Sequence, residues 1–162
     1  MNFTEQLNEV GIVLNDTQRS QFDKYFEILV EWNGFMNLTG ITEYEEVLVK
    51  HFLDSLAVGK YSEKFAGNPE LSIIDVGTGA GFPGLPLKIA YPQAKVVLLD
   101  SLNKRVKFLD EVITQLGLTG ITAVQRAQRK VQEMQLTGSS LTLVCRGLWL
   151  TYRHLWNTAC RL

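Results

Sequence analysis

The sequence has 162 residues, of which 46% are hydrophobic and 20% charged, and its formal net charge is -1. These values indicate one globular domain with a single sizeable core. They exclude a disordered chain, and the chain is too short for two domains that each have a sizeable core. No run approaches the roughly 18 apolar residues of a membrane-spanning helix, no signal-peptide pattern opens the chain, and two cysteines are too few for a disulfide framework or a four-ligand zinc site. We therefore expect a reduced, soluble, cytoplasmic protein without a bound metal.

The first section of the chain is predicted to be helical. Apolar residues recur at spacings of three and four over residues 3–14 and, more strongly, over 17–35, where charged residues are interleaved. Asp16 or Thr17 is expected to cap the second helix, residues 37–40 are expected to break it, and a third helix is predicted over 43–58. The simplest interpretation of the aromatic residues here is a packed helical core.

The central section alternates strands and helices. Short apolar runs over 71–76, 96–99 and 121–124 predict buried strands, and helices are expected over 86–90 and 104–116. Alternation at these lengths indicates βαβ units and a mostly parallel sheet. The predicted fold class is therefore α/β, with the N-terminal helices capping one side. A fourth strand is expected at about residues 141–145.

A glycine-rich segment follows the first predicted strand and allows several interpretations. In one, Gly79, Gly81 and Gly84 form the GxGxxG fingerprint of a dinucleotide site, with Asp100 as the ribose-binding acid. In another, Asp75 opens an Asp-x-Gly-x-Gly-x-Gly pattern that resembles the S-adenosylmethionine loop of Rossmann-like methyltransferases. The second pattern explains Asp75 better, because a carboxylate suits the cationic methionine ammonium and is awkward beside a pyrophosphate. A purely structural glycine turn is the third interpretation.

Asp100 ends the second predicted strand, one βα unit after the glycines. A carboxylate accepts hydrogen bonds from two neighbouring donors, so Asp100 is predicted to bind both ribose hydroxyls of a nucleoside. The alternatives are an exposed acid at a strand end and a cap for the following helix, for which Ser101 and Asn103 compete.

With these residues in place, the chain resembles the bacterial small-subunit ribosomal RNA methyltransferase G family, also called glucose-inhibited division protein B. The similarity covers roughly residues 1–124. The glycine loop alone is shared by many methyltransferases, whereas its Phe-Pro-Gly-Leu-Pro extension and the runs before and after it are far more specific. The matching segments are Trp32-Asn33, Asn37-Leu38-Thr39, His51-Phe52-Leu53-Asp54-Ser55, and residues 75–86 and 99–105.

The resemblance implies transfer of a methyl group from S-adenosylmethionine to N7 of one guanine in 16S ribosomal RNA, on a Rossmann-like methyltransferase sheet. It implies small-subunit ribosomal RNA as the partner, and no membrane. No catalytic acid or base is predicted, because guanine N7 carries a lone pair and no proton, so that catalysis reduces mainly to alignment.

The same resemblance assigns expected roles to individual residues. The cofactor is expected to be lined by Gly77, Gly79, Gly81 and Phe82, with Asp75 near its methionine end and Asp100 on its ribose. Residues of family-like stretches that are expected to contact RNA are His51, Asp54, Lys104 and Arg105. The alternatives are an ordinary core or surface histidine for His51 and a solvated helix start for the two cations.

The last quarter of the chain is composed differently from the rest. Up to Gly120 the chain carries ten basic and sixteen acidic residues, whereas from Ile121 on it carries six basic residues and one acidic residue. The family-like pattern also ends at about Val124. A methyltransferase sheet of this type usually has seven strands, and the chain leaves room for about four. We therefore expect an incomplete sheet whose fourth strand is an open edge.

Two interpretations of this segment stay open. A basic, aromatic tail suits RNA binding. A shifted reading frame is favoured, because the codons from Val144 on, when regrouped with allowed third bases, can read Val-Ser-Arg-Ala-Val-Ala-Asp-Leu, a family-like segment in its expected place. The predicted organisation is a helical cap over 1–66, the cofactor half of a methyltransferase core over 67–125 and a divergent segment over 126–162. Activity is then expected to be reduced or lost, with a non-catalytic cofactor- or RNA-binding remnant as the alternative function and an NAD-binding oxidoreductase as a weaker one.

Overall fold

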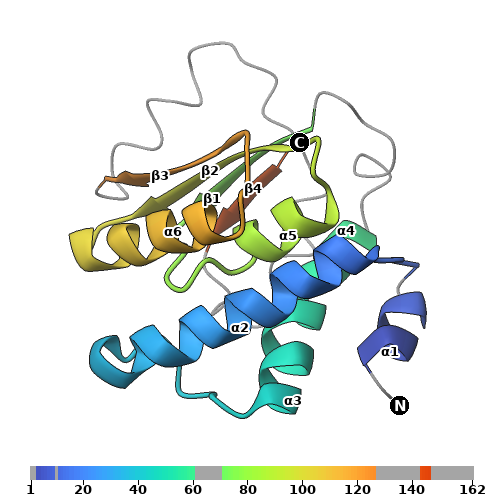
Figure 1. The fold of residues 1–162 in the computed structure, drawn as a ribbon. Coiled ribbons are helices and arrows are strands. Elements are labelled where there is room, and N and C mark those ends of the chain that lie inside the picture. Colours follow the sequence, from blue (N-terminus) through green and yellow to red (C-terminus); the bar gives the residue numbers. More distant parts are fainter. Residues whose placement is uncertain (1–2, 10, 61–70, 127–142, 147–162) are drawn as a thin grey trace.

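A computed structural model describes residues 3–9, 11–60, 71–126 and 143–146 (Figure 1). Helices precede the first strand, and strands and helices alternate after it, as the sequence predicts. In chain order the elements are α1 (Phe3–Glu9), α2 (Asp16–Met36), α3 (Tyr44–Val47), the π-helix η1 (Leu48–Leu53), α4 (Asp54–Lys60), β1 (Ser72–Val76), α5 (Gly84–Ala90), β2 (Lys95–Asp100), α6 (Asn103–Gln115), β3 (Ile121–Gln125) and β4 (Leu143–Arg146).

The four described strands form one parallel sheet in the order β3-β2-β1-β4. Ile73 of β1 is paired with Val96 of β2 on one side and with Leu143 of β4 on the other. The chain therefore adds strands outward from β1 as far as β3 and then returns to the opposite side of β1. In open parallel sheets, ligands bind outside the carboxyl ends of the strands at the point where the strand order reverses. Here that point lies between β1 and β4.

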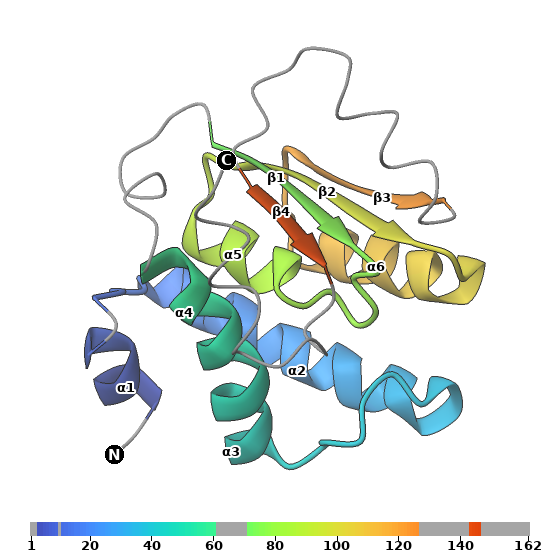
Figure 2. The same ribbon diagram turned by 180° about the vertical axis from the view of Figure 1, so that it is seen from behind.

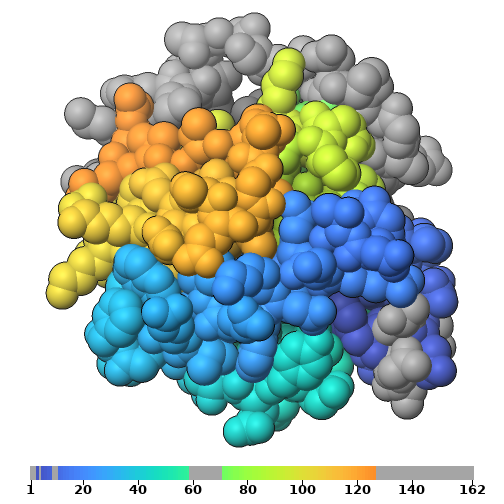
Figure 3. All heavy atoms as spheres, in the orientation of Figure 1, coloured from blue at the N-terminus to red at the C-terminus, as the bar shows by residue number. Residues whose placement is uncertain are grey.

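Helices cover one face of this sheet in two layers. Helices α5 and α6 pack directly on the strands, and α2 crosses both of them on the outside (Figures 1 and 2). In the space-filling view α2 closes against α5 and α6 (Figure 3). Because side chains alternate along a strand, Ile73 joins the large core shared with the helices, whereas Ile74 and Val76 join a smaller cluster on the other face.

The N-terminal helices belong to the same core as the sheet. Phe22 and Phe52 from the helical section are buried in one cluster with Leu98 of β2 and Phe108 of α6. The predicted cap over 1–66 therefore shares its hydrophobic core with the predicted methyltransferase segment. The predicted boundary at 66/67 lies outside the described residues, as does most of the predicted segment 126–162.

Two helix ends differ from the sequence-based expectation. Helix α2 is capped by Asn15 and not by Asp16 or Thr17: the Asn15 side chain accepts from the Gln18 N–H at 2.8 Å, and the Gln18 side chain accepts from the Asn15 N–H at 2.9 Å. This capping box satisfies two backbone donors at once, which a cap one residue later would not do. Helix α1 ends at Glu9 and not at 14, because Gly11 at φ +75° turns the chain and lets Ile12 N–H bond back to Leu7 O.

The predicted third helix over 43–58 is present but not uniform. Its middle, η1, is a π-helix that carries His51 and Phe52, and α-helical turns flank it. Single π-turns inside α-helices are frequently found at functional sites. The break predicted at residues 37–40 is confirmed, since Asn37 takes a left-handed conformation at φ +49° and ends α2.

Candidate functional site

The loop between β1 and α5 is built from glycines at positive φ. Gly77, Gly79 and Gly81 have φ values of +72°, +61° and +99°, a region that L side chains rarely adopt. The Gly77 and Thr78 N–H groups both donate to Leu99 O, at 2.8 and 3.1 Å, so the loop is fixed to the end of β2. The predicted turn is therefore present where the strand order reverses.

A buried carboxylate fixes this loop by hydrogen bonds. Asp75 is completely buried, and its Oδ2 accepts hydrogen bonds from Thr78 Oγ1 at 2.7 Å and from Gly84 N–H at 3.0 Å. Its Oδ1 is buried without a hydrogen-bond partner among the described residues. Burial raises the pKa of Asp75 to about 7, although both hydrogen bonds act in the opposite direction. The role that the structure shows for Asp75 is to fix the loop; contact with the methionine end of a cofactor stays a prediction.

Asp100 connects the end of β2 to the same loop. Its side chain is 2% exposed, and Oδ2 accepts from Gly79 N–H at 3.0 Å while Oδ1 accepts from Leu102 N–H at 2.9 Å. Arg105 Nη1 lies 3.6 Å from Oδ2. The structure thus supports part of the alternative interpretation, because Asp100 stabilises the chain before α6. Each carboxylate oxygen still has a second lone pair for a ribose hydroxyl.

The loop glycines differ in what a side chain at each of them would meet. A Cβ built on Gly79 has no described atom within 4 Å, so the backbone there faces open space. A Cβ on Gly81 would lie 2.3 Å from Leu85 Cδ1 and 2.8 Å from the Tyr25 hydroxyl oxygen. A Cβ on Gly84 would lie 2.3 Å from Leu98 Cδ2. Of these three glycines, only Gly79 has open space where a side chain would stand, whereas packing excludes a side chain at Gly81 and Gly84. Contact of the Gly81 backbone with a cofactor stays a prediction.

An aromatic cluster joins the loop to the N-terminal helices. The Phe82 side chain is 7% exposed, and its ring lies 5.7 Å from that of Tyr25 and stacks on His51 at 4.6 Å and 15°. The Tyr25 hydroxyl donates to Ala80 O at 2.5 Å. Phe82 is thus in contact with the helical layer, and cofactor contact through its side chain stays a prediction.

The sequence pattern predicts Tyr25 only as one of the aromatic residues of a packed helical core. The structure gives it a further role, because its hydroxyl is fully buried and holds the loop carbonyl of Ala80. Burial, and the charge of Asp75, raise the pKa of Tyr25, so the hydroxyl keeps its proton and acts as a donor. The available signal was chemical: a buried tyrosine hydroxyl needs a hydrogen-bond partner, and a glycine loop supplies free carbonyls.

The residues expected to contact RNA lie in two places. His51 is half-buried, its Nε2 is 2.8 Å from Thr39 Oγ1, and burial lowers its pKa. Asp54 is exposed at the start of α4, and desolvation raises its pKa. Lys104 and Arg105 lie in the first turn of α6, Lys104 exposed and Arg105 near Asp100. Arg105 is thus linked to the glycine loop through Asp100, and His51 is linked to it through Phe82.

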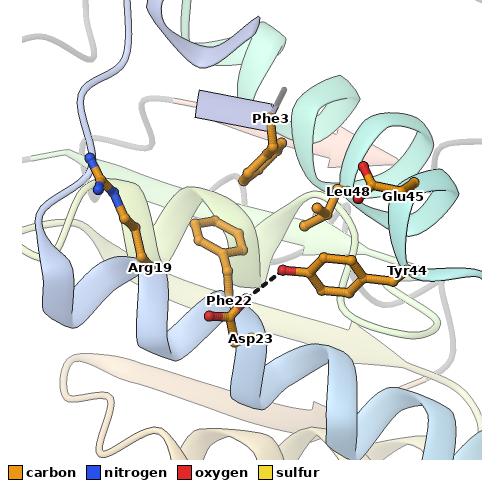
Figure 4. Close-up of a pocket in the computed structure, with 7 residues that line it drawn as sticks. All are labelled: Phe3, Arg19, Phe22, Asp23, Tyr44, Glu45 and Leu48. Carbon is orange, nitrogen blue, oxygen red and sulfur yellow. Dashed lines mark hydrogen bonds between the residues drawn. The ribbon is translucent and has the colours of Figure 1, made fainter. Parts of the chain in front are cut away.

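A surface hollow lies among α1, α2, α3 and η1. Its volume is about 290 Å³, and its described lining residues are Phe3, Arg19, Phe22, Asp23, Tyr44, Glu45 and Leu48 (Figure 4). The Tyr44 hydroxyl donates to Asp23 Oδ1 at 2.7 Å across it. None of the site residues expected from the sequence lines this hollow.

No helix in the described part of the chain is long and apolar enough to cross a membrane. No group of three or more His, Cys, Asp or Glu side chains there is arranged to hold a metal ion.

Comparison with known proteins identifies a family. Residues 18–157 match the family described as rRNA small subunit methyltransferase G. A ribosomal RNA small subunit methyltransferase G from Lachnoclostridium phytofermentans is 52% identical over 147 residues, which cover 90% of this chain and 60% of the relative. The corresponding Staphylococcus carnosus protein is 53% identical over 125 residues, covering 76% of this chain and 51% of the relative. The chain therefore spans between half and three fifths of the length of these relatives.

The extent of these matches differs at the C-terminal end. The family match continues to residue 157, beyond Val124, where the sequence-based resemblance ends.

A Plasmodium falciparum structure described as a beta-aspartate methyltransferase in complex with S-adenosyl-L-homocysteine is 15% identical, with a TM-score of 0.42, over 82% of this chain and 67% of that one.

Proposed function

Because the chain belongs to the rRNA small subunit methyltransferase G family, we propose that it is built to transfer a methyl group from S-adenosylmethionine to N7 of a guanine in 16S ribosomal RNA. The observation that carries the proposal is the loop between β1 and α5, with the open backbone at Gly79 and with Asp100 beside it. An RNA substrate of this kind also implies that the chain works in the cytoplasm.

The residues present fit an adenosyl cofactor. The space around Gly79 leaves room for a ligand against the backbone, and Asp100 Oδ1 and Oδ2 each accept one backbone N–H while keeping lone pairs for the ribose. Gly77, Gly79 and Gly81 give the loop its shape, and Asp75 fixes it from below. In the competing dinucleotide pattern Gly84 is the third glycine, which allows close packing of a helix on a strand, so its packing on Leu98 fits both patterns. The family match favours the methyltransferase pattern.

The chain's part in the reaction is to position two partners. S-adenosylmethionine, when bound, supplies a methyl group on a positively charged sulfur that is already an activated leaving group. Guanine N7 has an in-plane lone pair and no proton, so the chain needs no general base. The loop and Asp100 hold the adenosyl group, and Lys104 and Arg105 are proposed to meet RNA phosphates nearby. For His51 and Asp54 the RNA role stays a prediction; the stacking of His51 on Phe82 suits a positioning role.

The reading-frame hypothesis gives the test of this function. The 162-residue chain is expected to show little or no guanine-N7 methylation if the predicted frame change replaces family residues of the segment 126–162. Full activity is the competing outcome, because the family match itself continues to residue 157. A gene restored to the family-like frame should yield a protein that methylates small-subunit RNA lacking that modification. The assay is transfer of labelled methyl groups to RNA by both proteins, together with the nucleotide sequence from codon 120 on. Comparable turnover by the two proteins would refute the frame hypothesis and favour a functional basic tail, and no turnover by either would contradict the proposed function.

Asp100→Ala is expected to weaken binding of S-adenosylhomocysteine by about 10–100-fold, since hydrogen bonds to a charged group contribute about 1.5–3 kcal/mol each. The loss should be selective for intact ribose hydroxyls. Binding is measured by calorimetry with S-adenosylhomocysteine and its deoxyribose analogue, and unfolding of the variant is followed separately. Equal loss for the two ligands would mean that Asp100 acts only by holding Gly79 and Leu102.

A further inference from the structure

Two large apolar side chains are exposed together beside the proposed cofactor loop. Phe35, near the end of α2, is 67% exposed, and Leu102, just before α6, is 52% exposed. They line one surface hollow of about 330 Å³, whose other described lining residues are Met36, Asn103, Lys104 and Arg105. We call these six residues the Phe35–Leu102 surface. The end of α2 and the start of α6 lie on the same side of the molecule, at the left of Figure 1.

The Phe35 ring packs against another aromatic ring on the side that faces the core. It lies 5.3 Å from the Trp32 ring at an interplanar angle of 43°, and Trp32 in turn packs edge-on against Phe108 at 5.7 Å. Phe108 is completely buried. A chain of ring contacts therefore leads from the core to an aromatic side chain at the surface, so that Phe35 offers a supported apolar face to solvent.

Hydrogen bonds and an ion pair join this surface to the cofactor loop. Leu102 N–H donates to Asp100 Oδ1, and Arg105 Nη1 lies 3.6 Å from Asp100 Oδ2. The same Oδ2 accepts from Gly79 N–H. The Phe35–Leu102 surface is thus directly next to the loop where the methyl group is proposed to be delivered.

The charge of the surface selects one class of partner. Of its described lining residues, two are cations and none is an acid. The hollow in Figure 4 has a similar volume but includes Asp23 and Glu45, which would repel a polyanion. Single-stranded nucleic acids bind where an exposed aromatic ring stacks on an unpaired base and nearby cations meet the phosphates. A partner protein with an apolar surface would need the exposed aromatic ring but not the two cations. The combination therefore favours a single-stranded nucleic acid.

We propose that the Phe35–Leu102 surface docks a single-stranded segment of the RNA substrate, with an unpaired base stacked on Phe35 and flanking phosphates at Lys104 and Arg105. This inference rests on the proposed function, since it assumes that RNA is the substrate. It extends that function by placing the RNA strand on the α2–α6 side of the loop, and by assigning Phe35 and Leu102 to substrate binding.

The test measures binding of the full chain to a fluorescently labelled single-stranded RNA oligonucleotide. Phe35→Ala is expected to weaken binding by about 5–100-fold, which corresponds to the loss of one base stacked on an aromatic ring. Phe35→Tyr keeps a stacking face and should restore most of the affinity. Lys104→Ala should reduce the slope of the logarithm of affinity against the logarithm of salt concentration by about 0.7, the value for one phosphate contact on a single strand.

Two matched variants control for the chemical change alone. Val13 is 81% exposed and lies before α2, so Val13→Ala removes exposed apolar area elsewhere. Lys24 is an exposed cation of α2 that pairs with Glu27, so Lys24→Ala removes one positive charge from another place. Neither variant should change RNA affinity or its salt dependence by as much as the test variants. Equal effects of Phe35→Ala and Val13→Ala would overturn the proposal, as would a stronger loss with duplex RNA than with the single strand.

A parallel titration with S-adenosylhomocysteine separates this proposal from the proposed function. Phe35→Ala should leave that binding unchanged, because the ring lies outside the loop. If the cofactor binds while Phe35→Ala leaves RNA affinity unchanged, the docking surface is wrong and the cofactor assignment stands. If the chain does not bind S-adenosylhomocysteine but loses RNA affinity in Phe35→Ala, the surface stands and the cofactor assignment fails.

Discussion

Gly81→Ala is expected to lower the free energy of unfolding by about 2–6 kcal/mol. The glycine has a φ of +99°, so an alanine there is strained by about 1–3 kcal/mol. The new Cβ would also lie 2.3 Å from Leu85 Cδ1 and 2.8 Å from the Tyr25 hydroxyl oxygen, and overpacking of this kind costs about another 1–3 kcal/mol. Leu85 and Tyr25 are completely buried and have little room to move. Urea unfolding of both proteins measures the effect.

Gly79→Ala is the matched control for this prediction. Its φ of +61° carries strain of about 1–2 kcal/mol, but its Cβ would point into open space, so the loss of stability should be smaller. Its effect on S-adenosylhomocysteine affinity should be clear even in the fully folded protein, because the Cβ would enter the space proposed for the cofactor. Equal destabilisation by the two substitutions would show that packing at Gly81 is unimportant. Unchanged affinity in Gly79→Ala would count against the loop as the cofactor site.

The free energy of unfolding is expected to fall as the pH rises from about 4 to about 7, through Asp75. Burial raises the pKa of this carboxyl from 3.8 to about 7 in the folded chain, and the nearby Asp100 adds to the effect. Below pH 3.8 both the folded and unfolded forms are protonated, and the contribution of Asp75 is fully present. Between the two pKa values only the folded form keeps its proton, so the contribution is lost as the pH rises. This difference between the pKa of Asp75 in the folded and in the unfolded chain corresponds to roughly 4 kcal/mol of unfolding free energy in total.

Asp75→Asn removes this titration while its carbonyl oxygen can still accept from Thr78 Oγ1 and Gly84 N–H. Urea unfolding of both proteins between pH 4 and pH 8 measures the difference in stability. The stability of the unsubstituted chain relative to Asp75→Asn should decrease steadily over this range and become constant above about pH 7. A relative stability that does not change with pH, or that increases, would show that Asp75 is ionised throughout in the folded protein.

Several parts of the fold follow directly from the sequence pattern. The strand at β1, the helix at α2 and the alternation after residue 71 are predicted correctly, because apolar periodicity and runs of β-branched residues reflect burial on one or both faces. The glycine-rich segment after β1 is predicted from the motif, and the structure shows it with positive φ values at Gly77 and Gly79, which glycine adopts without strain. The predicted range of each helix or strand is least accurate at its ends, because single hydrogen bonds decide at which residue it begins or ends.

Side-chain partners distant in the sequence could not be predicted in the same way. Tyr25 and Ala80 are separated by 55 positions, and only the packing of α2 across α5 brings the hydroxyl to the loop carbonyl. The clash that excludes a side chain at Gly81 comes from Tyr25 and Leu85 together. The motif alone predicts ligand contact for Gly81, and only the structure shows that packing also excludes a side chain at Gly81 and Gly84.

The sequence alone determined the fold class, the position of the glycine loop and the family-like segments, because these depend on local spacing and residue type. The tertiary structure decided how each polar group of the site is used. Asp75, for which contact with the methionine end of a cofactor stays a prediction, is buried and fixes the loop through Thr78 and Gly84. Asp100 accepts from backbone N–H groups of two different loops. The Phe35–Leu102 surface likewise exists only because two helix ends, 67 positions apart in the sequence, meet beside that loop. Periodicity reports which face of an element is buried, and it does not report which neighbour lies against that face.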